Sequence, residues 1–442
     1  MNVASKRAGG IDEMNTTRTY GRRIDADAGN HFIPQMPPKS QLPLTDTDPT
    51  STDPFPSQRQ ERLDPYGEGK IVVIGGYGSV GRRVCRLLAE SFPERVYAAG
   101  RSLEAARQFS EETNGAVQPL HWEVGLTDPK MGTADQGYDL ADVDLIVMCL
   151  DQQHPHLIRQ CLKEGTHYVD ITAQADFLRE ASRLNLPNPQ AAALLSVGLA
   201  PGLTNLLAAR ASAALERTER IEISLMLGLG ESHGRAAIAW TIDQMGASFT
   251  LQGSDGARRV SAMTGGRTVD FGGALGRKRV YRFPFSDQFT LPDTLGIADI
   301  QTRLGFDING VSQTAAALRR LGLFSLLRWR PLRQAIIALA GSLHVGSEQF
   351  AVQVRAYGQH QGRSAQATCK LHGVNQTDIT ARAAAHAAAA LLKRSDLRGI
   401  LHLEQLLDAN SVWSAIRPAS ASELEFDLSL QMPGSALSEN RA

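Results

Sequence analysis

The chain has 442 residues, which is long enough for two domains that each bury a substantial core. Its 46 basic and 46 acidic residues give a formal net charge of zero, which argues against generic nucleic-acid binding, because that needs a basic face. The four cysteines are scattered with no C-x-x-C spacing, so the sequence predicts a reducing, cytoplasmic compartment and no structural metal. No apolar run approaches the roughly 18 residues of a transmembrane helix, and the first residues lack the apolar core of a signal peptide.

Residues 1–68 differ in composition from the rest of the chain. They are rich in Pro, Ser, Thr, Asp, Arg and Gln, and they show neither a helix period nor a strand period. Such a segment buries too little apolar surface to offset its ordering entropy, so we expect a disordered extension. A transit peptide is a weaker interpretation, because acidic residues are frequent here.

Residues 69–205 alternate between strand and helix patterns, which predicts an α/β, doubly wound parallel sheet of the Rossmann type. The expected strands are Lys70–Ile74, Arg95–Ala99, Val117–Trp122, Asp144–Leu150, Thr166–Ile171 and Ala192–Val197. The expected helices are Val80–Ser91, Leu103–Thr113, His154–Glu164 and Ala175–Arg183. Ligands of such sheets bind beyond the carboxyl ends of the strands, so the residues just after each strand carry most of the functional information.

A glycine turn follows the first strand in the stretch KIVVIGGYGSVG, residues 70–81. Gly76, Gly78 and Gly81 match G-x-G-x-x-G between a strand and a helix, which is the context that a dinucleotide site requires. We expect Gly76 to allow the turn, Gly78 to let the backbone approach a pyrophosphate, and Gly81 to let the helix pack closely. The predicted cofactor residues of this turn are Gly76, Tyr77, Gly78, Ser79, Val80 and Gly81. The alternative is a glycine turn without a ligand.

The end of the second strand predicts which nicotinamide cofactor binds. It reads Gly100, Arg101 and Ser102, with no carboxylate to hold a free ribose 2′-hydroxyl. A small residue, a positive charge and a hydroxyl suit a 2′-phosphate, so we expect NADP (NADPH) rather than NAD. Alternatively, Arg101 is only a solvated charge. Leu150, at the carboxyl end of the expected fourth strand and so at the same edge, completes the predicted cofactor site.

Residues 206–375 predict a second, α+β domain, whose sheet is a candidate dimer surface. Ile221–Gly228, Phe350–Tyr357 and Ser364–Leu371 alternate apolar and polar residues, and the last two read as an antiparallel hairpin. We expect an open, mixed or mostly antiparallel sheet with helices on one face. Leu318–Leu343 is apolar and basic and is interrupted by Pro331. It either lies on an anionic membrane surface or forms two helices packed on the domain with arginines outward.

Residues 376–417 read as C-terminal helices. The first of them is alanine-rich, and Thr377 or Asp378 is its expected cap. Residues 418–442 are expected to form a flexible tail.

Taken together, several of these stretches resemble the saccharopine dehydrogenase-like family. They are GGYGSVGRRVCRLLA (75–89), AAGRS (98–102), HYVDIT (167–172) and GLAPGLTN (198–205), with weaker support from PFSDQFTL (284–291) and GILHLEQL (399–406). The resemblance implies an NAD(P)-binding Rossmann domain, a second domain with the substrate cleft that often dimerises, and C-terminal helices that return to the first domain. It also implies NADPH-dependent reduction of an imine, that is, oxidoreduction at a C–N bond. The stretch 171–175 lacks the polar run of amino-acid-processing relatives, so an identical substrate is not expected.

Asp170 is the first candidate for catalysis. It stands at the carboxyl end of the fifth strand, and HYVD is similar to a family loop near cofactor and substrate. A carboxylate there can keep an iminium protonated, whereas the alternative is a cap on the following helix. His154 and His156 follow the fourth strand, where they face the nicotinamide or simply begin a helix.

Polar residues of the second domain supply the remaining candidates. Glu231, His233 and Arg235 follow a strand, with His233 proposed as catalytic and the other two as substrate ligands. Arg277, with its neighbours Lys278 and Arg279, is a candidate for gripping a substrate carboxylate, and Asp287 is a further substrate candidate. Solvated loop residues are the alternative for all of them.

The leading interpretation is an NADP-dependent oxidoreductase that acts on the imine or amine of a small amino-acid-like or polyamine-like carboxylate. One alternative is a membrane-associated reductase of a lipid or polyketide double bond, and another is a non-catalytic NADP sensor. The expected partners are a small-molecule substrate and a second copy of the chain, with no nucleic acid.

Overall fold

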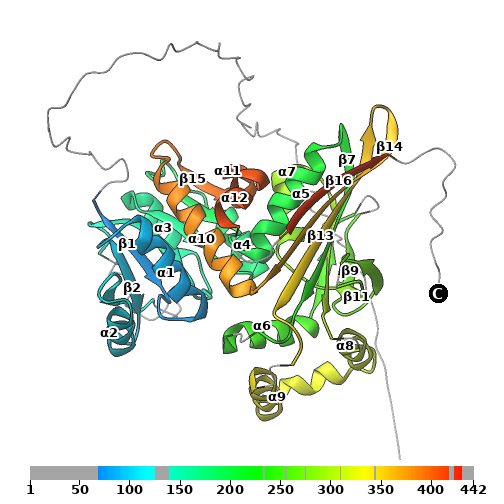
Figure 1. Ribbon diagram of the computed structural model, residues 1–442, viewed down its shortest axis with the longest axis horizontal. Helices are drawn as coiled ribbons and strands as arrows, with labels where there is room; N and C mark the ends of the chain where they lie inside the picture. The colour runs from blue at the N-terminus through cyan, green and yellow to red at the C-terminus, as the bar shows by residue number, and fades with distance from the viewer. Residues whose placement is uncertain are drawn as a thin grey trace, which may run out of the picture. The chain divides into compact units, whose positions relative to one another are not determined.

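The computed structural model describes residues 68–124, 139–231, 234–253, 256–273, 275–308, 310–342 and 345–417, together with the backbone of 423–430. The predicted extension, residues 1–68, lies outside the described residues apart from Glu68. Two seven-stranded sheets, here called sheet A and sheet B, organise the described chain (Figure 1).

Sheet A is fully parallel and has the order β15-β6-β5-β4-β1-β2-β3. Its strands are β1 (Lys70–Ile74), β2 (Val96–Gly100), β3 (Gln118–His121), β4 (Val143–Met148), β5 (His167–Asp170), β6 (Ala192–Leu195) and β15 (Gly399–His402). In β1, Ile71 and Val73 enter one apolar core and Val72 and Ile74 enter another, because helices cover both faces. The predicted doubly wound parallel sheet is confirmed. Its seventh strand, β15, was missed.

The helices that connect these strands begin and end near the predicted residues. They are α1 (Ser79–Ser91), α2 (Leu103–Glu112), α3 (His156–Glu164) and α4 (Ala175–Ser182). The C-terminal helices are α10 (Gln376–Leu392), α11 (Leu403–Leu406) and α12 (Ala409–Ile416). The buried alanines of α10, including Ala381, Ala384 and Ala388, let it pack directly on α1. The C-terminal part of the chain therefore returns to the first sheet.

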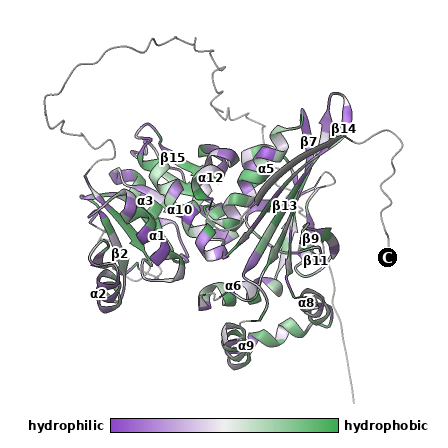
Figure 2. Cartoon of the chain, viewed as in Figure 1, coloured by the Kyte–Doolittle hydropathy of each residue, from purple (hydrophilic) through white to green (hydrophobic). Residues whose placement is uncertain are grey.

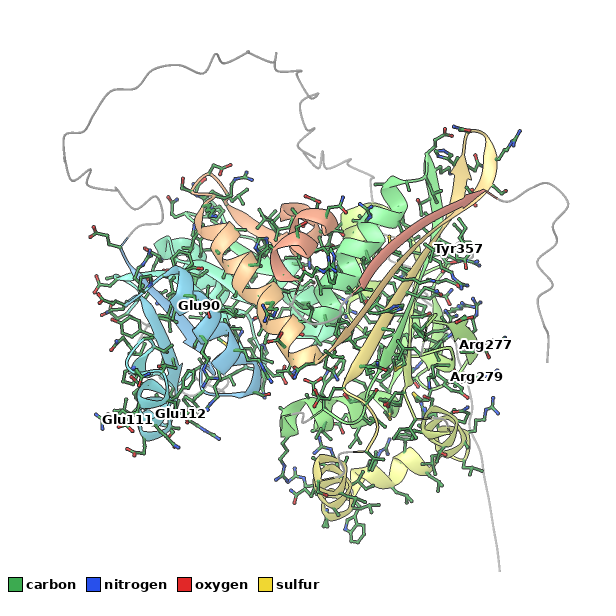
Figure 3. All side chains as sticks on the ribbon, in the orientation of Figure 1. Glu90, Glu111, Glu112, Arg277, Arg279 and Tyr357 are labelled. Carbon is green, nitrogen blue, oxygen red and sulfur yellow. The ribbon has the colours of Figure 1, made fainter. Side chains whose placement is uncertain are left out.

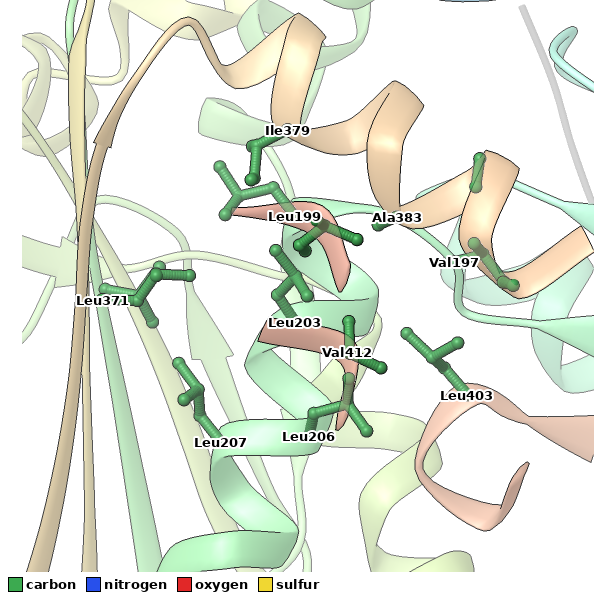
Figure 4. Close-up of a cluster of buried hydrophobic side chains, with 14 of the residues drawn as sticks. Val197, Leu199, Leu203, Leu206, Leu207, Leu371, Ile379, Ala383, Leu403 and Val412 are labelled. Carbon is green, nitrogen blue, oxygen red and sulfur yellow. The ribbon is translucent and has the colours of Figure 1, made fainter. Parts of the chain in front are cut away.

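The link to the second sheet runs through the short turn η1 (Leu199–Leu203) and helix α5 (Thr204–Ala213). Leu199, Leu203 and Leu207 of this link lie among buried side chains from α10 and β14, such as Ile379 and Leu371 (Figure 4). A single apolar cluster thus joins the link, the C-terminal helix and the second sheet.

Sheet B is mixed and has the order β10-β11-β12-β7-β13-β14-β16. Its strands are β7 (Arg217–Leu227), β10 (Arg267–Asp270), β11 (Arg277–Arg282), β12 (Asp299–Phe306), β13 (Gln349–His360), β14 (Arg363–Val374) and β16 (Glu423–Leu430). Only β12 and β7 pair in parallel. The predicted hairpin is β13–β14, and it turns at Gln361 and Gly362, whose φ angles are 50° and 69°.

Two expectations about the C-terminal part are wrong. Glu423–Leu430 is not a flexible tail, because it pairs antiparallel with β14 as strand β16. The cap of α10 is neither Thr377 nor Asp378. Instead, Asn375 accepts a hydrogen bond from the Asp378 backbone N–H at 2.8 Å. Asn adopts the left-handed backbone of this position, φ 62°, more readily than most residues do.

The remaining elements surround sheet B. They are α6 (Arg235–Met245), β8 (Ser248–Leu251), β9 (Arg258–Ser261), α7 (Asp287–Leu295), α8 (Val311–Arg320), η2 (Leu323–Arg328) and α9 (Arg330–Ser342). The stretch 318–343 is indeed broken, since Pro331 stands in the first turn of α9, where a missing N–H costs nothing. None of the helices within the described ranges is long and apolar enough to cross a membrane.

Candidate functional site

The glycine turn after β1 is built from three backbone contacts. The N–H groups of Gly75 and Gly76 both donate to the Ala99 carbonyl, at 2.8 and 3.3 Å, and the Gly78 N–H donates to the Gly75 carbonyl at 2.9 Å. Gly75 has a φ of 78°, so Gly75 is the residue that makes the turn possible. The prediction that Gly76 has this role is wrong. A Cβ on Gly76 would lie 2.7 Å from the Cα of Ala98, so Gly76 serves the close approach of β2.

Gly81 and Gly78 have different physical roles in this turn. A Cβ on Gly81 would lie 2.2 Å from the Gly75 carbonyl oxygen, so its absence lets α1 pack against the turn. A Cβ on Gly78 would meet only the Gly75 carbonyl oxygen, at 3.1 Å, and Gly78 itself is exposed. The protein's own packing therefore requires Gly81 far more than Gly78, and open space remains over Gly78.

Helix α1 begins at Ser79, and no side chain among the described residues caps its N-terminus. Gly78 is its N-cap and supplies no side-chain hydrogen bond, and the first turn contains no acidic residue. Ser79 is exposed and Val80 half-buried. The N–H groups and the positive end of the helix dipole are thus available to an anion.

The end of β2 has the composition expected for a 2′-phosphate. Arg101 is exposed and has no hydrogen-bond or ion-pair partner among the residues that the structure describes. The Ser102 backbone N–H donates to the Tyr77 hydroxyl at 3.0 Å, and the Ser102 hydroxyl caps α2 by accepting from the Ala105 N–H at 3.2 Å. Tyr77 lies over Gly100, where a Cβ would come within 2.5 Å of its hydroxyl. The residues at this strand end therefore fit NADP.

Leu150 borders the same edge from β4. Its side chain is 47% exposed and lies over Gly75, since a Cβ on that glycine would come within 2.9 Å of Leu150 carbons. All predicted cofactor residues thus stand at the carboxyl ends of β1, β2 and β4.

Asp170 lies at the predicted edge but inside the protein. Its side chain is 0% exposed. Its Oδ1 accepts from the Thr172 N–H at 2.7 Å, and its Oδ2 accepts from the Tyr168 hydroxyl at 2.7 Å and from Gln152 Nε2 at 3.2 Å. It does not cap α4, whose N-cap is Gln174. Direct contact with a substrate is not favoured by this closed arrangement.

Burial dominates the ionisation of this cluster. It raises the pKa of Asp170 to about 7, although the hydrogen bonds from Thr172 and Tyr168 oppose the rise. The nearby carboxylate of Asp151 raises that pKa further. A buried acid with such a pKa changes protonation near neutrality, which is frequent at functional sites.

Asp151 is the carboxylate that the sequence analysis passed over. It is exposed in the loop after β4, and its Oδ1 accepts from the Thr172 hydroxyl at 3.1 Å. Thr172 therefore connects an exposed carboxylate to the buried Asp170. The signal for Asp151 was its position three residues after β4, a strand that pairs with β1, since parallel sheets bind ligands beyond such strand ends.

His154 and His156 follow the same strand. His156 is the first residue of α3, and His154 lies 3.7 Å from Glu180 of α4. Both are exposed, and their rings are 5.6 Å apart. The alternative that they begin a helix is correct for His156.

Of the second-domain candidates, Glu231 has a structural role. It is 6% exposed, and its carboxylate accepts the backbone N–H groups of Gln376 and Thr377 at 2.8 and 2.9 Å. A carboxylate on the N-terminus of α10 is favourable for the helix dipole. The prediction that Glu231 binds substrate is therefore not supported by its contacts. His233 lies outside the described residues.

The other candidates are not gathered into one site. Arg235 begins α6 and is exposed, whereas Arg277 begins β11 beside the edge strand β10 (Figure 3). Lys278 and Arg279 also lie in β11, where Lys278 Nζ donates to the Asp307 carbonyl at 2.7 Å.

Asp287 is the first residue of α7 and is fully buried. Its Oδ1 accepts from the Thr302 hydroxyl at 2.6 Å and from the Gln288 N–H at 2.7 Å. Burial raises its pKa to about 6, with hydrogen bonds from Thr302 and Thr204 acting in the opposite direction. Asp287 thus joins α7 to β12 and to the start of α5, and a substrate would not reach it without movement.

A hydrogen-bonded cluster around β15 was not anticipated. His402 contacts the Ser196 hydroxyl at 2.8 Å and the Ser182 hydroxyl at 3.0 Å, and burial lowers its pKa. Glu404 accepts from Asn205 Nδ2 at 3.1 Å and from the Thr294 hydroxyl at 2.7 Å. These contacts join β15 to α4 and to the end of β6, and they join α11 to α5 and α7.

Comparison with known proteins points to one domain family. Residues 71–193 match the family model for the saccharopine dehydrogenase NADP binding domain. Among solved structures, the chain is similar to apo saccharopine dehydrogenase (L-Glu forming) from Saccharomyces cerevisiae. That match has a TM-score of 0.55 and 13% identity over 82% of this chain and 100% of that chain, and it shows a shared fold. A match to DAP dehydrogenase of C. glutamicum has a TM-score of 0.38 and 15% identity, over 79% of this chain and 96% of that chain. A search of curated protein sequences found no match.

Proposed function

Because residues 71–193 belong to the saccharopine dehydrogenase NADP-binding domain family, we propose that the protein is an NADP(H)-dependent oxidoreductase that acts on a C–N bond. The proposed reaction reduces an imine, or oxidises a secondary amine, of a small carboxylated metabolite of amino-acid or polyamine type. The observation that carries this proposal is the exposed Arg101, which has no partner among the described residues and follows the strand next to the glycine turn of an NADP-type domain.

The proposed binding mode follows from the groups left free at the edge of sheet A. The N-terminus of α1 and the open space over Gly78 would hold the pyrophosphate. Arg101 would hold the 2′-phosphate through charge-assisted hydrogen bonds. When bound, NADPH supplies the hydride.

Asp151 is the group that we propose to act on the imine. An iminium carries a positive charge at nitrogen, and a carboxylate beside it favours that protonated form. Asp151 is exposed at the required edge, and Thr172 fixes one of its oxygens. In this proposal the buried Asp170 is a positioning residue, because it holds the Thr172 N–H and so orients the loop that carries the Thr172 hydroxyl.

Arg235 is the residue that we propose to bind a carboxylate group of the substrate. It is exposed, it begins a helix after β7, and it has no partner within the part of the chain that the structure describes. A homodimer through the sheet of the second domain remains a prediction, which sedimentation of the full chain at several concentrations tests.

Titration of the full chain with NADPH and with NADH tests the cofactor. Replacing Arg101 by alanine should weaken NADPH binding by about 1–3 kcal/mol and leave NADH binding nearly unchanged. The exposed Arg183, at the far end of α4, provides a matched control, since Arg183→Ala should change neither affinity. Equal losses for both cofactors in Arg101→Ala would contradict the assignment.

NADPH consumption with mixtures of amines and keto acids tests the reaction. Asp151→Asn should lower kcat/KM by about 100-fold or more while NADPH affinity is retained. Asp142→Asn, at the opposite end of β4, should leave the rate unchanged. NADPH binding without turnover on any amine and keto acid mixture would reject the C–N reaction and favour a sensor.

A further inference from the structure

Exposed apolar side chains concentrate in one segment of the second domain. Of the nine large apolar side chains that are exposed among the described residues, seven lie between residues 318 and 345, and the other two are Leu150 and Val374. The most exposed are Leu321 at 72%, Trp329 at 65% and Leu339 at 58%. Single exposed apolar residues are ordinary, but such a local concentration marks an interaction surface.

This segment, residues 318–342, comprises the end of α8, η2 and α9. We call it the apolar–basic segment. Figure 2 shows hydrophobic residues along the ribbon between α8 and α9. Only Ile337 is buried in α9, and none of the residues of α6 is buried. Formation of a core therefore does not account for its apolar composition.

The segment is nevertheless fixed to the domain by two of its five arginines. Arg333 forms a two-pronged ion pair with Asp243 of α6, at 2.8 and 2.5 Å. Arg319 donates to the Ala247 carbonyl at 3.3 Å and to the Ser248 hydroxyl at 3.0 Å. These contacts hold the segment in place without covering its apolar side chains.

The other three arginines are free to meet a partner. Arg320, Arg328 and Arg330 are exposed, and none has an ion-pair or hydrogen-bond partner within the described ranges. Between Asp307 and Glu348 the sequence contains no acidic residue at all. Uncompensated positive charge thus adjoins exposed apolar surface, and Trp329 stands between Arg328 and Arg330.

We propose that the apolar–basic segment docks the protein on the surface of an anionic lipid bilayer. Leucines and Trp329 would enter the boundary between headgroups and acyl chains, while the three free arginines would contact anionic headgroups. Helix α9 has 13 residues, about 20 Å, which is too short to span a bilayer but sufficient to lie on one. A second copy of the chain fits this surface less well, because a twofold interface would place the same arginines against each other.

Flotation of the full chain with lipid vesicles tests the proposal. We expect binding to phosphatidylcholine vesicles that contain roughly 30% phosphatidylglycerol, weak binding to phosphatidylcholine alone, and release by about 0.5 M salt. The triple variant Arg320→Glu/Arg328→Glu/Arg330→Glu should reduce partitioning by about 100-fold or more. The variant Leu321→Gln/Trp329→Gln should reduce it by at least about 10-fold, because it removes apolar contact and keeps the charge.

A matched control carries two charge reversals elsewhere on the domain. Arg217→Glu/Arg363→Glu alters exposed ends of sheet B strands and should retain vesicle binding. NADPH titration on every variant reports whether the first domain is intact, so this test is independent of the proposed reaction. The proposal is overturned by binding that ignores lipid charge, by binding that survives both segment variants, or by no binding at all. It is also overturned if the segment variants abolish self-association and the chain does not bind vesicles.

Discussion

Sheets A and B have the same number of strands but differ in what covers them. Every residue from Ile71 to Ile74 in sheet A is buried in apolar surroundings. In β7 of sheet B, Ile223 faces the apolar core, whereas the adjacent Glu222 and Ser224 belong to a polar face. A strand buried on two apolar faces leaves polar residues only at its ends, so function concentrates there. A strand with a polar face carries charged residues along its length, where they interact with one another.

Arg303 and Glu222 carry opposite charges on the polar face of sheet B and attract each other. Two nitrogens of Arg303, Nε and Nη1, are buried without a hydrogen-bond partner among the described residues. Arg303 is 1% exposed and donates to Gln301 Oε1 at 3.0 Å, and burial lowers its pKa to about 10. Glu222 accepts from Arg267 at 2.5 Å. Burial would raise the pKa of Glu222, but Arg267 and Arg303 together bring it below its usual value. Charged residues on this face interact with one another, so their presence by itself does not indicate a substrate site.

Of the substitutions that test this difference between the two sheets, Gly81→Val, at the glycine turn of sheet A, should destabilise the protein most. The new side chain would begin 2.2 Å from a backbone oxygen, so either α1 or the turn must move. We expect a loss of about 4 kcal/mol or more in the free energy of unfolding, measured by urea denaturation. A variant of wild-type stability would show that sheet A tolerates rearrangement at its edge.

The buried aspartates should make stability depend on pH. With a folded-state pKa of about 7, against 3.8 for the unfolded chain, Asp170 keeps a proton that the unfolded chain releases between about pH 4 and 7. The free energy of unfolding should therefore fall as pH rises through this window, by up to about 4 kcal/mol from Asp170.

Asp287 should also make the free energy of unfolding fall as pH rises, but over a narrower pH range, because its folded-state pKa is about 6. Asp170→Asn should make the free energy of unfolding depend less on pH between about pH 4 and 7. Asp287→Asn should do so only between about pH 4 and 6. Urea denaturation across this range measures both. An unaltered pH slope in Asp170→Asn would mean that the buried carboxyl is ionised throughout.

Gly78→Val separates ligand binding from packing at the same turn. The Cβ of the new side chain meets only one atom beyond its chain neighbours, the Gly75 carbonyl oxygen, so we expect the free energy of unfolding to fall by about 1 kcal/mol or less. NADPH affinity should fall by about 100-fold or more, because the new side chain fills the space over the helix N-terminus. Retained affinity in a calorimetric titration would place the pyrophosphate elsewhere.

The smallest effect is expected on the polar face of sheet B. Glu222→Gln removes the carboxylate that Arg267 contacts and leaves the buried Arg303 with less compensating charge, so we expect a loss of about 2 kcal/mol. The exposed Glu219 on the same strand is the matched control, and Glu219→Gln should cost less than about 0.5 kcal/mol. Similar losses of stability in both variants would indicate that Glu222 is solvated and that its interactions with the arginines do not stabilise the fold.

Local sequence was a good guide wherever neighbours in the chain are neighbours in space. The strand, glycine turn and helix at 70–91 were predicted within one residue of their observed bounds, because apolar runs and glycines act over a few residues. The role of Gly75 was misassigned to Gly76, since the sequence does not reveal which of two adjacent glycines takes the positive φ. β15 and β16 were missed because each short strand is stabilised by a partner far away in the chain.

By itself, the amino-acid sequence predicted the parallel sheet and a glycine turn typical of dinucleotide sites, and it showed that no carboxylate adjoins Arg101. Those features depend on residue type and on spacings of a few residues. Only the tertiary structure decided that Asp170 is buried, that Asp151 is the carboxylate at the open edge, and that Glu231 holds the start of α10. Those outcomes depend on burial and on contacts between residues as far apart as 231 and 377. Neither burial nor such long-range contacts can be predicted from a short stretch of sequence, because packing brings distant segments together and decides which polar groups remain in water.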